Sequence, residues 1–219
     1  MKFYTFLIIF IVFSLNVNAW NSYNHKALVD KVYYSLDFET QKNLNLSSME
    51  EGSIVPDKVF HDVRLHHYPP SYNKSLFWLD KAKIDYRNKN YNEASDDFGI
   101  AAHYISDSFV APHYISKEPG SLHSKFENIK DYRFKTECHD DKLDLEENLI
   151  IGSKNKEDWG LWIVNQTYDL PKKEIEQSLY TLYPFALETF NSKCNDFKTE
   201  IVKRSSITGF FTWILDIFK

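Results

Sequence analysis

Histidines and acidic residues suited to metal binding are concentrated between Ala101 and Glu127, in the stretch AAHYISDSFVAPHYISKEPGSLHSKFE. Its potential metal ligands are His103, Asp107, His113, His123 and Glu127. Two pairs, His103 with Asp107 and His123 with Glu127, are spaced so that on a helix both members share one face, one turn apart. Imidazole nitrogen and carboxylate oxygen are the ligands that zinc takes at hydrolytic sites. The stretch therefore predicts a hydrolytic zinc centre.

Either pair alone is weak evidence. The chain has 8 His and 31 acidic residues in 219 positions, so about one His-x3-acid pair is expected by chance. Polar residues on the solvent face of an amphipathic helix would give the same pattern. The pairs carry weight only together with other residues of the chain.

The segments that contain and surround these residues are predicted to be helices. Apolar residues recur at helical spacing in His25–Leu36, Tyr72–Arg87, a segment from about Asn90 through Ile105, a short segment around His123 and Glu127, Asp141–Ile151, Lys156–Tyr168, and Pro171 to about Lys203. Pro112 should end or bend the helix of His103 just before His113, and Pro184 should kink or split the last helix. We find no alternating run long enough for a strand. The predicted fold class is an all-α multi-helix bundle.

A second group of candidates precedes the central stretch. The segment Gly52-Ser53-Ile54-Val55-Pro56-Asp57 is predicted to be a turn that presents Asp57 at the end of a short helix. His66 and His67 follow, just before Pro69 and Pro70 break the chain.

The first 19 residues, 1–19, have the pattern of a secretory signal peptide. Lys2 supplies a positive charge, Phe3–Leu15 is nearly all apolar, and Ala19 is a small residue at the cleavage position. The apolar run is short for a transmembrane helix, although an uncleaved anchor is an alternative. Cleavage would make Trp20 the amino terminus, whose amine and carbonyl could chelate a metal. The alternative for Trp20 is simple packing in the core.

The rest of the mature chain, 20–203, has the length of one catalytic domain. The tail, 204–219, is strongly apolar and follows Lys203. It would either lie in a membrane interface or pack on the body. The net charge of −5 does not favour non-specific binding of nucleic acid. Cys138 and Cys194 are an even pair in a secreted chain, which predicts one disulfide.

In chain order, the candidate ligands are Trp20, His25, Asp57, His66 or His67, His103, Asp107, His113, His123 and Glu127. This series resembles the zinc-dependent phospholipase C family, which shares its fold and metal-site plan with fungal-type single-strand nucleases. The motifs that carry the resemblance read Trp20-x4-His25, Pro56-Asp57, His66-His67-Tyr68, His103-x3-Asp107-x5-His113 and His123-x3-Glu127. Each motif is weak alone, but their order behind a signal peptide makes them strong together. The resemblance covers about Trp20 to Glu127.

The resemblance implies a bundle that holds three zinc ions. The ions would be bound by Trp20 with His25 and Asp107; by Asp107, His103 and the His66/His67 position with Asp57 as ligand or close partner; and by His113, His123 and Glu127. His66 is preferred because HHYPP resembles the family's His-aromatic-aromatic-x-Pro pattern, but His67 stays open. His61 and His139 have no place in the pattern and are predicted to be surface residues. The implied reaction is phosphodiester hydrolysis by a zinc-bound hydroxide, with Asp57 orienting the water or accepting its proton.

We therefore expect a secreted, monomeric zinc-dependent phospholipase C acting on phospholipid headgroups at a membrane surface. One alternative is a secreted single-strand nuclease or other phosphodiesterase on the same zinc core. The Trp20-x4-His25 spacing supports it, and exposed stacking aromatics at the site would favour it. The other alternative is a non-catalytic helical binding protein. The gaps from Asp57 to His66 and from His113 to His123 look short for the family, so the headgroup or base specificity stays open.

Overall fold

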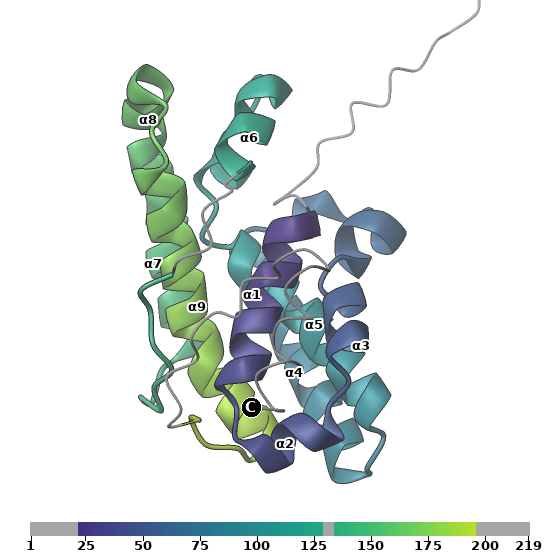
Figure 1. Ribbon diagram of the computed structural model, residues 1–219. Helices are drawn as coiled ribbons and strands as arrows, with labels where there is room; N and C mark the ends of the chain where they lie inside the picture. The colour runs from purple at the N-terminus through teal and green to yellow at the C-terminus, as the bar shows by residue number, and fades with distance from the viewer. Residues whose placement is uncertain (1–21, 129–133, 196–219) are drawn as a thin grey trace, which may run out of the picture.

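The computed structural model describes residues 22–128 and 134–195, and in this part of the chain the structure is built from helices (Figure 1). The α-helices are α1 (Ser22–Ser35), α2 (Phe38–Asn43), α3 (Leu46–Gly52), α4 (Pro70–Arg87), α5 (Tyr91–Asp107), α6 (Gly120–Glu127), α7 (Leu145–Ser153), α8 (Trp159–Asn165) and α9 (Asp169–Phe190). Between them lie a π-helical turn, η1 (Pro56–Phe60), and three 3-10 turns, η2 (Val63–Leu65), η3 (Ala111–Tyr114) and η4 (Lys154–Asp158). Within the described ranges there is no strand beyond one isolated bridge between Leu36 and Cys194. The all-α prediction is confirmed.

Helix α5 is the centre of the bundle. It packs against α3 and α4 and also contacts α1 and α9. Every residue from Asp97 to Asp107 is buried, as expected of a helix that is covered on all sides. His103 and Asp107, four residues apart at its C-terminal end, therefore lie inside the protein.

Two glycines let α3 cross α5 at very short range. A Cβ atom on Gly99 would lie 2.2 Å from the carbonyl oxygen of Met49, and one on Gly52 would lie 2.1 Å from that of Asp96. Only glycine permits backbones to approach so closely. The crossing brings Ser53, and the η1 turn that follows it, against the end of α5 that carries His103.

Several helix ends differ from the prediction. Helix α9 ends at Phe190, not near Lys203, because Asn191 adopts a left-handed conformation (φ 50°). Pro184 lies within α9 and does not split it. The helix predicted over 156–168 is divided into η4 and α8, and α8 ends where Gln166 takes a φ of 48°. A left-handed residue stops a helix whatever the hydrophobic pattern beyond it.

The predicted disulfide between Cys138 and Cys194 is present, and the backbone N–H of Asn195 donates to the carbonyl of Ser35. The disulfide joins the end of the described chain to the segment before α7, and the hydrogen bond joins it to the end of α1. The signal peptide, Trp20 and the tail 204–219 lie outside the described residues. Within those residues, no helix is both long and apolar enough to cross a bilayer.

Candidate metal centre

Asp107 is the point on which the candidate ligands converge. Its Oδ2 lies 3.0 Å from His66 Nδ1 and 3.2 Å from His103 Nε2, while its Oδ1 lies 3.4 Å from His25 Nε2. His113 Nδ1 is 3.8 Å from Oδ2. The Asp107 side chain is 0% exposed, so this carboxylate is held among four imidazoles without direct access to solvent.

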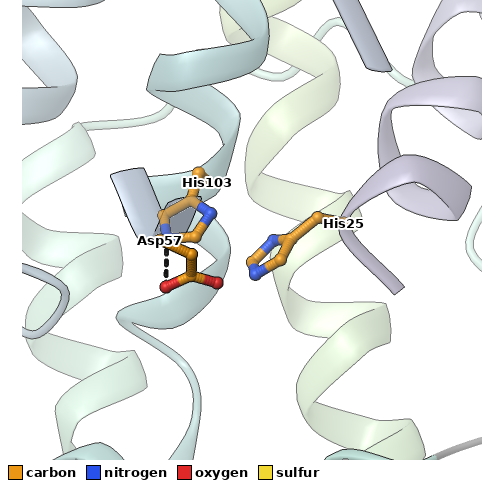
Figure 2. A group of neighbouring side chains, drawn as sticks. All are labelled: His25, Asp57 and His103. Atoms are coloured by element: carbon orange, nitrogen blue, oxygen red, sulfur yellow. Dashed lines mark ion pairs between the residues drawn. The ribbon is translucent and has the colours of Figure 1, made fainter. Parts of the chain in front are cut away.

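Asp57 closes the cluster from the η1 turn. Its Oδ1 lies 3.6 Å from His66 Nδ1 and 3.8 Å from His103 Nε2. Figure 2 shows its carboxylate beneath the His103 ring, with the His25 ring of α1 pointing toward both. The side chain is 12% exposed, so Asp57 can meet water while Asp107 cannot.

A second carboxylate, that of Glu127 in α6, lies close to two imidazoles. Glu127 Oε1 lies 2.5 Å from His123 Nε2 and 3.2 Å from His113 Nε2. His113 thus has one ring nitrogen toward Glu127 and the other toward Asp107. It can occupy this place because α5 ends at Asp107 and the chain turns into η3 around Pro112, as the proline predicted.

Three sets of side chains in the described ranges have donor atoms close enough to share a cation. They are His25 with Asp57 and His103; His66 with His103 and Asp107; and His113 with His123 and Glu127, with the donor atoms of each set all within 4.8 Å of one another. The last two sets have the membership that the family resemblance implies. In the first set, His25 is grouped with Asp57 and His103 rather than with Trp20, which lies outside the described residues.

In three of the four imidazoles around Asp107, the second ring nitrogen is occupied by a partner outside the cluster. His103 Nδ1 lies 2.8 Å from the Ser53 carbonyl, which fixes Nδ1 as the N–H donor and leaves Nε2 facing Asp107. His66 Nε2 lies 3.1 Å from Asp62 Oδ1. His25 Nδ1 lies 3.3 Å from Ser106 Oγ. Such contacts fix the tautomer and the orientation of a ligating imidazole.

Glu118 provides the same support for His123 and was missed by sequence reasoning. Its Oε1 contacts His123 Nδ1, and Nε2 of that ring faces Glu127. Glu118 lies between η3 and α6, five positions before His123, where no helical spacing marks it. Asp62 could have been found, because it precedes His66 by four residues, the spacing of the ligand pairs.

The electrostatics of the cluster are dominated by burial and by opposite charge at short range. Burial would lower the pKa of His103, but the carboxylates of Asp107 and Asp57 outweigh it and raise that pKa to about 9. Burial would raise the pKa of Asp107, yet the imidazoles, His103 first, hold it well below its usual value. Burial lowers the pKa of His113 to about 3 and raises that of Glu127 to about 8. Bound protons therefore offset the negative charge of the buried carboxylates, and a bound metal cation would displace these protons.

The arrangement of the donor atoms suits coordination of a metal ion better than hydrogen bonding among the side chains themselves. Both carboxylate oxygens of Asp107, Asp57 Oδ1, His25 Nε2 and His113 Nδ1 are buried and have no hydrogen-bond partner among the described residues. Buried polar atoms are rarely left unpaired, and these all belong to the converging set. An N/O donor set of this composition suits zinc.

The remaining histidines stand apart from the cluster. His67 follows His66, but its ring stacks on Tyr114 at a centroid distance of 5.4 Å. His61 is exposed, as predicted, and its Nδ1 lies 2.7 Å from the Asp57 carbonyl. His139 is partly exposed, as the prediction of a surface position requires, and it stacks on Tyr180 at 4.0 Å. None of the three belongs to a donor set in the described ranges.

Comparison with known proteins gives one match. The family model described as zinc dependent phospholipase C matches residues 24–184. No curated protein and no solved structure matches the chain.

Proposed function

Because the chain belongs to the zinc-dependent phospholipase C family, we propose that it is a secreted phosphodiester hydrolase that cleaves phospholipid headgroups. The observation that carries the proposal is the buried Asp107 carboxylate, surrounded by four imidazoles whose outer nitrogens are already occupied or turned to a second carboxylate. A zinc phosphodiesterase needs such a set of fixed donors.

The proposed ligands follow the donor sets. One zinc would be held by His113, His123 and Glu127. A second would be held by His66, His103 and Asp107, with Asp57 beside it. A third would be held by His25 and Asp107 together with the amine and carbonyl of Trp20 once the signal peptide is removed. The count of three and the role of Trp20 are part of the proposal.

Zinc bound here would lower the pKa of coordinated water and polarise the phosphoryl oxygens. The chain itself supplies orientation and proton transfer. Burial raises the pKa of Asp57, against the opposing effect of His103. Its Oδ1 has no hydrogen-bond partner among the described residues. We assign it to orienting the attacking water and accepting its proton.

The direct test is metal content together with substrate choice. The secreted protein should retain about three zinc ions per chain, and mass spectrometry should find Trp20 at its amino terminus. Phosphatidylcholine and single-stranded DNA are then offered in parallel. Release of diacylglycerol and a phosphorylated headgroup supports the proposal, whereas cleavage of DNA alone supports the nuclease alternative.

The control is Asp107→Ala. Removing the carboxylate on which four histidines converge should abolish zinc-dependent hydrolysis and lower the zinc content. A fully active Asp107→Ala protein would refute the proposed site. Wild-type protein that does not retain zinc would favour the non-catalytic alternative.

A further inference from the structure

An exposed apolar patch lies beside the candidate metal centre. We define the patch as the exposed side chains of Val59, Phe60, Val63 and Phe77 together with the half-buried Trp78, from the η1–η2 segment and α4. Val59 is 64% exposed and Phe77 60% exposed. The Phe60 ring stacks on the Trp78 ring at a centroid distance of 5.9 Å, and the Phe77 ring meets the Trp78 ring edge-on at 5.1 Å. The three rings thus form a continuous surface.

The patch connects with the cluster through one short chain of contacts. Phe60 and Asp57 share the same turn, η1. Lys74 Nζ lies 5.9 Å from the centre of the Phe60 ring and 3.3 Å from Asp62 Oδ2. Asp62 in turn contacts His66 Nε2 through its other oxygen. A ligand seated on the patch would therefore lie next to the segment that carries Asp57 and His66.

Basic side chains lie around the patch, although the whole chain has a net charge of −5. Lys58 and Arg64 are exposed on the same segment. Lys81 Nζ lies 5.6 Å from the centre of the Trp78 ring and is also ion-paired with Asp97 at 2.7 Å, so the positive charge at the patch comes chiefly from the first two residues. Exposed apolar side chains with basic residues around them are the pattern of a surface that sits at the headgroup level of an anionic bilayer.

The geometry of the rings argues against base stacking as the use of this surface. A stacking platform must offer free ring faces. Here Phe60 and Trp78 are nearly parallel, at an interplanar angle of 18°, and each covers a face of the other. The two valines have no π-face at all. Ring edges and aliphatic groups suit hydrocarbon better than nucleobases.

We propose that this patch is a membrane-docking face that seats the protein on phospholipid bilayers containing anionic lipid. Docking would place Asp57 and His66 close to the headgroups. The inference rests on the proposed function for its purpose, because an enzyme that cleaves headgroups gains from being held at the lipid surface, but docking itself is measured without hydrolysis.

The test compares Phe77→Ala with the matched control Phe38→Ala, each in the full zinc-loaded chain. Phe38 is 66% exposed on α2 and also lies beside a lysine, Lys42. Helix α2 is at the end of the bundle away from α6 (Figure 1). Both substitutions remove one exposed phenylalanine from a helix, so neither should disturb folding. Any contribution of residues outside the described ranges is common to all the proteins.

Binding is measured by sedimentation with vesicles of phosphatidylcholine and phosphatidylglycerol in equal parts. Phe77→Ala should bind about tenfold more weakly than wild type, since it loses most of the burial of one aromatic side chain. Phe38→Ala should bind like wild type. Hydrolysis of vesicle lipid should fall in parallel, while hydrolysis of the soluble ester p-nitrophenyl phosphocholine stays unchanged.

Equal vesicle binding by Phe77→Ala and wild type overturns the inference. So does a loss of self-association, or of binding to a single-stranded oligonucleotide, with vesicle binding intact, because the patch would then serve another occupant. If no protein hydrolyses the soluble ester or any phospholipid while Phe77→Ala alone loses vesicle binding, the proposed function fails and the docking face stands.

Discussion

His66 and His67 are neighbours in the chain, yet their rings lie in different environments. His66 is 1% exposed, with Nδ1 3.0 Å from Asp107 Oδ2, whereas His67 stacks on Tyr114. The sequence left both open as the ligand, because each is followed by residues that fit the family pattern. The geometry favours His66.

Replacing each of the two histidines by alanine gives a matched pair. His66→Ala should lower the zinc content by about one ion per chain and reduce hydrolysis by a factor of about 100 or more, since a ligand and a contact to Asp107 are lost together. His67→Ala should keep its zinc and most of its activity. Zinc is measured by mass spectrometry and hydrolysis with the soluble ester. The reverse pattern would transfer the ligand role to His67.

Glu118 is predicted to act on metal affinity through His123. Glu118→Gln keeps the size of the side chain but removes the charge that contacts Nδ1 of that imidazole. Loss of such an outer partner typically weakens metal binding about 10- to 100-fold. The affinity for the most weakly held zinc is measured by competition with a chelator. Glu146→Gln is the control, because Glu146 is exposed and, in the described part of the chain, accepts a hydrogen bond from Tyr68 and makes no contact with the candidate ligands. An unchanged zinc affinity in Glu118→Gln would contradict the assignment.

Local patterns were enough to predict the all-α fold and the placement of two His-x3-acid pairs on helices, because helical periodicity and four-residue spacing are properties of the segment itself. The support given by Glu118 to His123 could not be predicted, since it depends on how the loop before α6 folds back. The end of α9 was missed for a related reason. Asn191 ends the helix, and the Leu36–Cys194 bridge and the hydrogen bond from Asn195 to Ser35 hold the chain beside the end of α1. These tertiary contacts outweigh the helical pattern that continues toward Lys203.

The crossing of α3 and α5 was also beyond the sequence, and it yields a stability prediction. In Gly99→Ala the new methyl group would lie 2.2 Å from the Met49 carbonyl. The helices must separate, at a cost of about 1 to 3 kcal/mol. Because Ser53 orients His103 at this crossing, zinc affinity should fall as well. Urea unfolding and zinc titration measure the two effects.

Gly160→Ala is the control for the crossing. A Cβ at Gly160 would meet nothing within 4 Å, and alanine is the better helix former by about 1 kcal/mol. This variant should be as stable as wild type or more so. If Gly99→Ala behaved in the same way, the close approach would have no energetic consequence and the proposed link between fold and site would be wrong.

Glu174 of α9 should make the protein less stable as pH rises. The residue is fully buried; its Oε2 accepts from the Ala111 N–H, and its Oε1 has no hydrogen-bond partner among the described residues. Burial raises its pKa well above 4.5. The folded protein therefore keeps a proton that the unfolded chain releases. Below about pH 4.5 the Glu174 carboxyl is protonated in both states and does not change the free energy of unfolding. Above that pH it lowers the free energy of unfolding, by at most about 1.4 kcal/mol per pH unit.

Glu174→Gln should remove this pH dependence, because glutamine is neutral at every pH and can still accept from Ala111. Its free energy of unfolding should match wild type near pH 4.5 and exceed it increasingly toward neutral pH, as measured by urea unfolding in the presence of a chelator. Glu188→Gln, at an exposed position of the same helix, should show no such divergence. A Glu174→Gln protein less stable than wild type at neutral pH would mean that the ionised carboxylate is stabilised by a partner, and that Glu174 supports η3 and His113 as a charge.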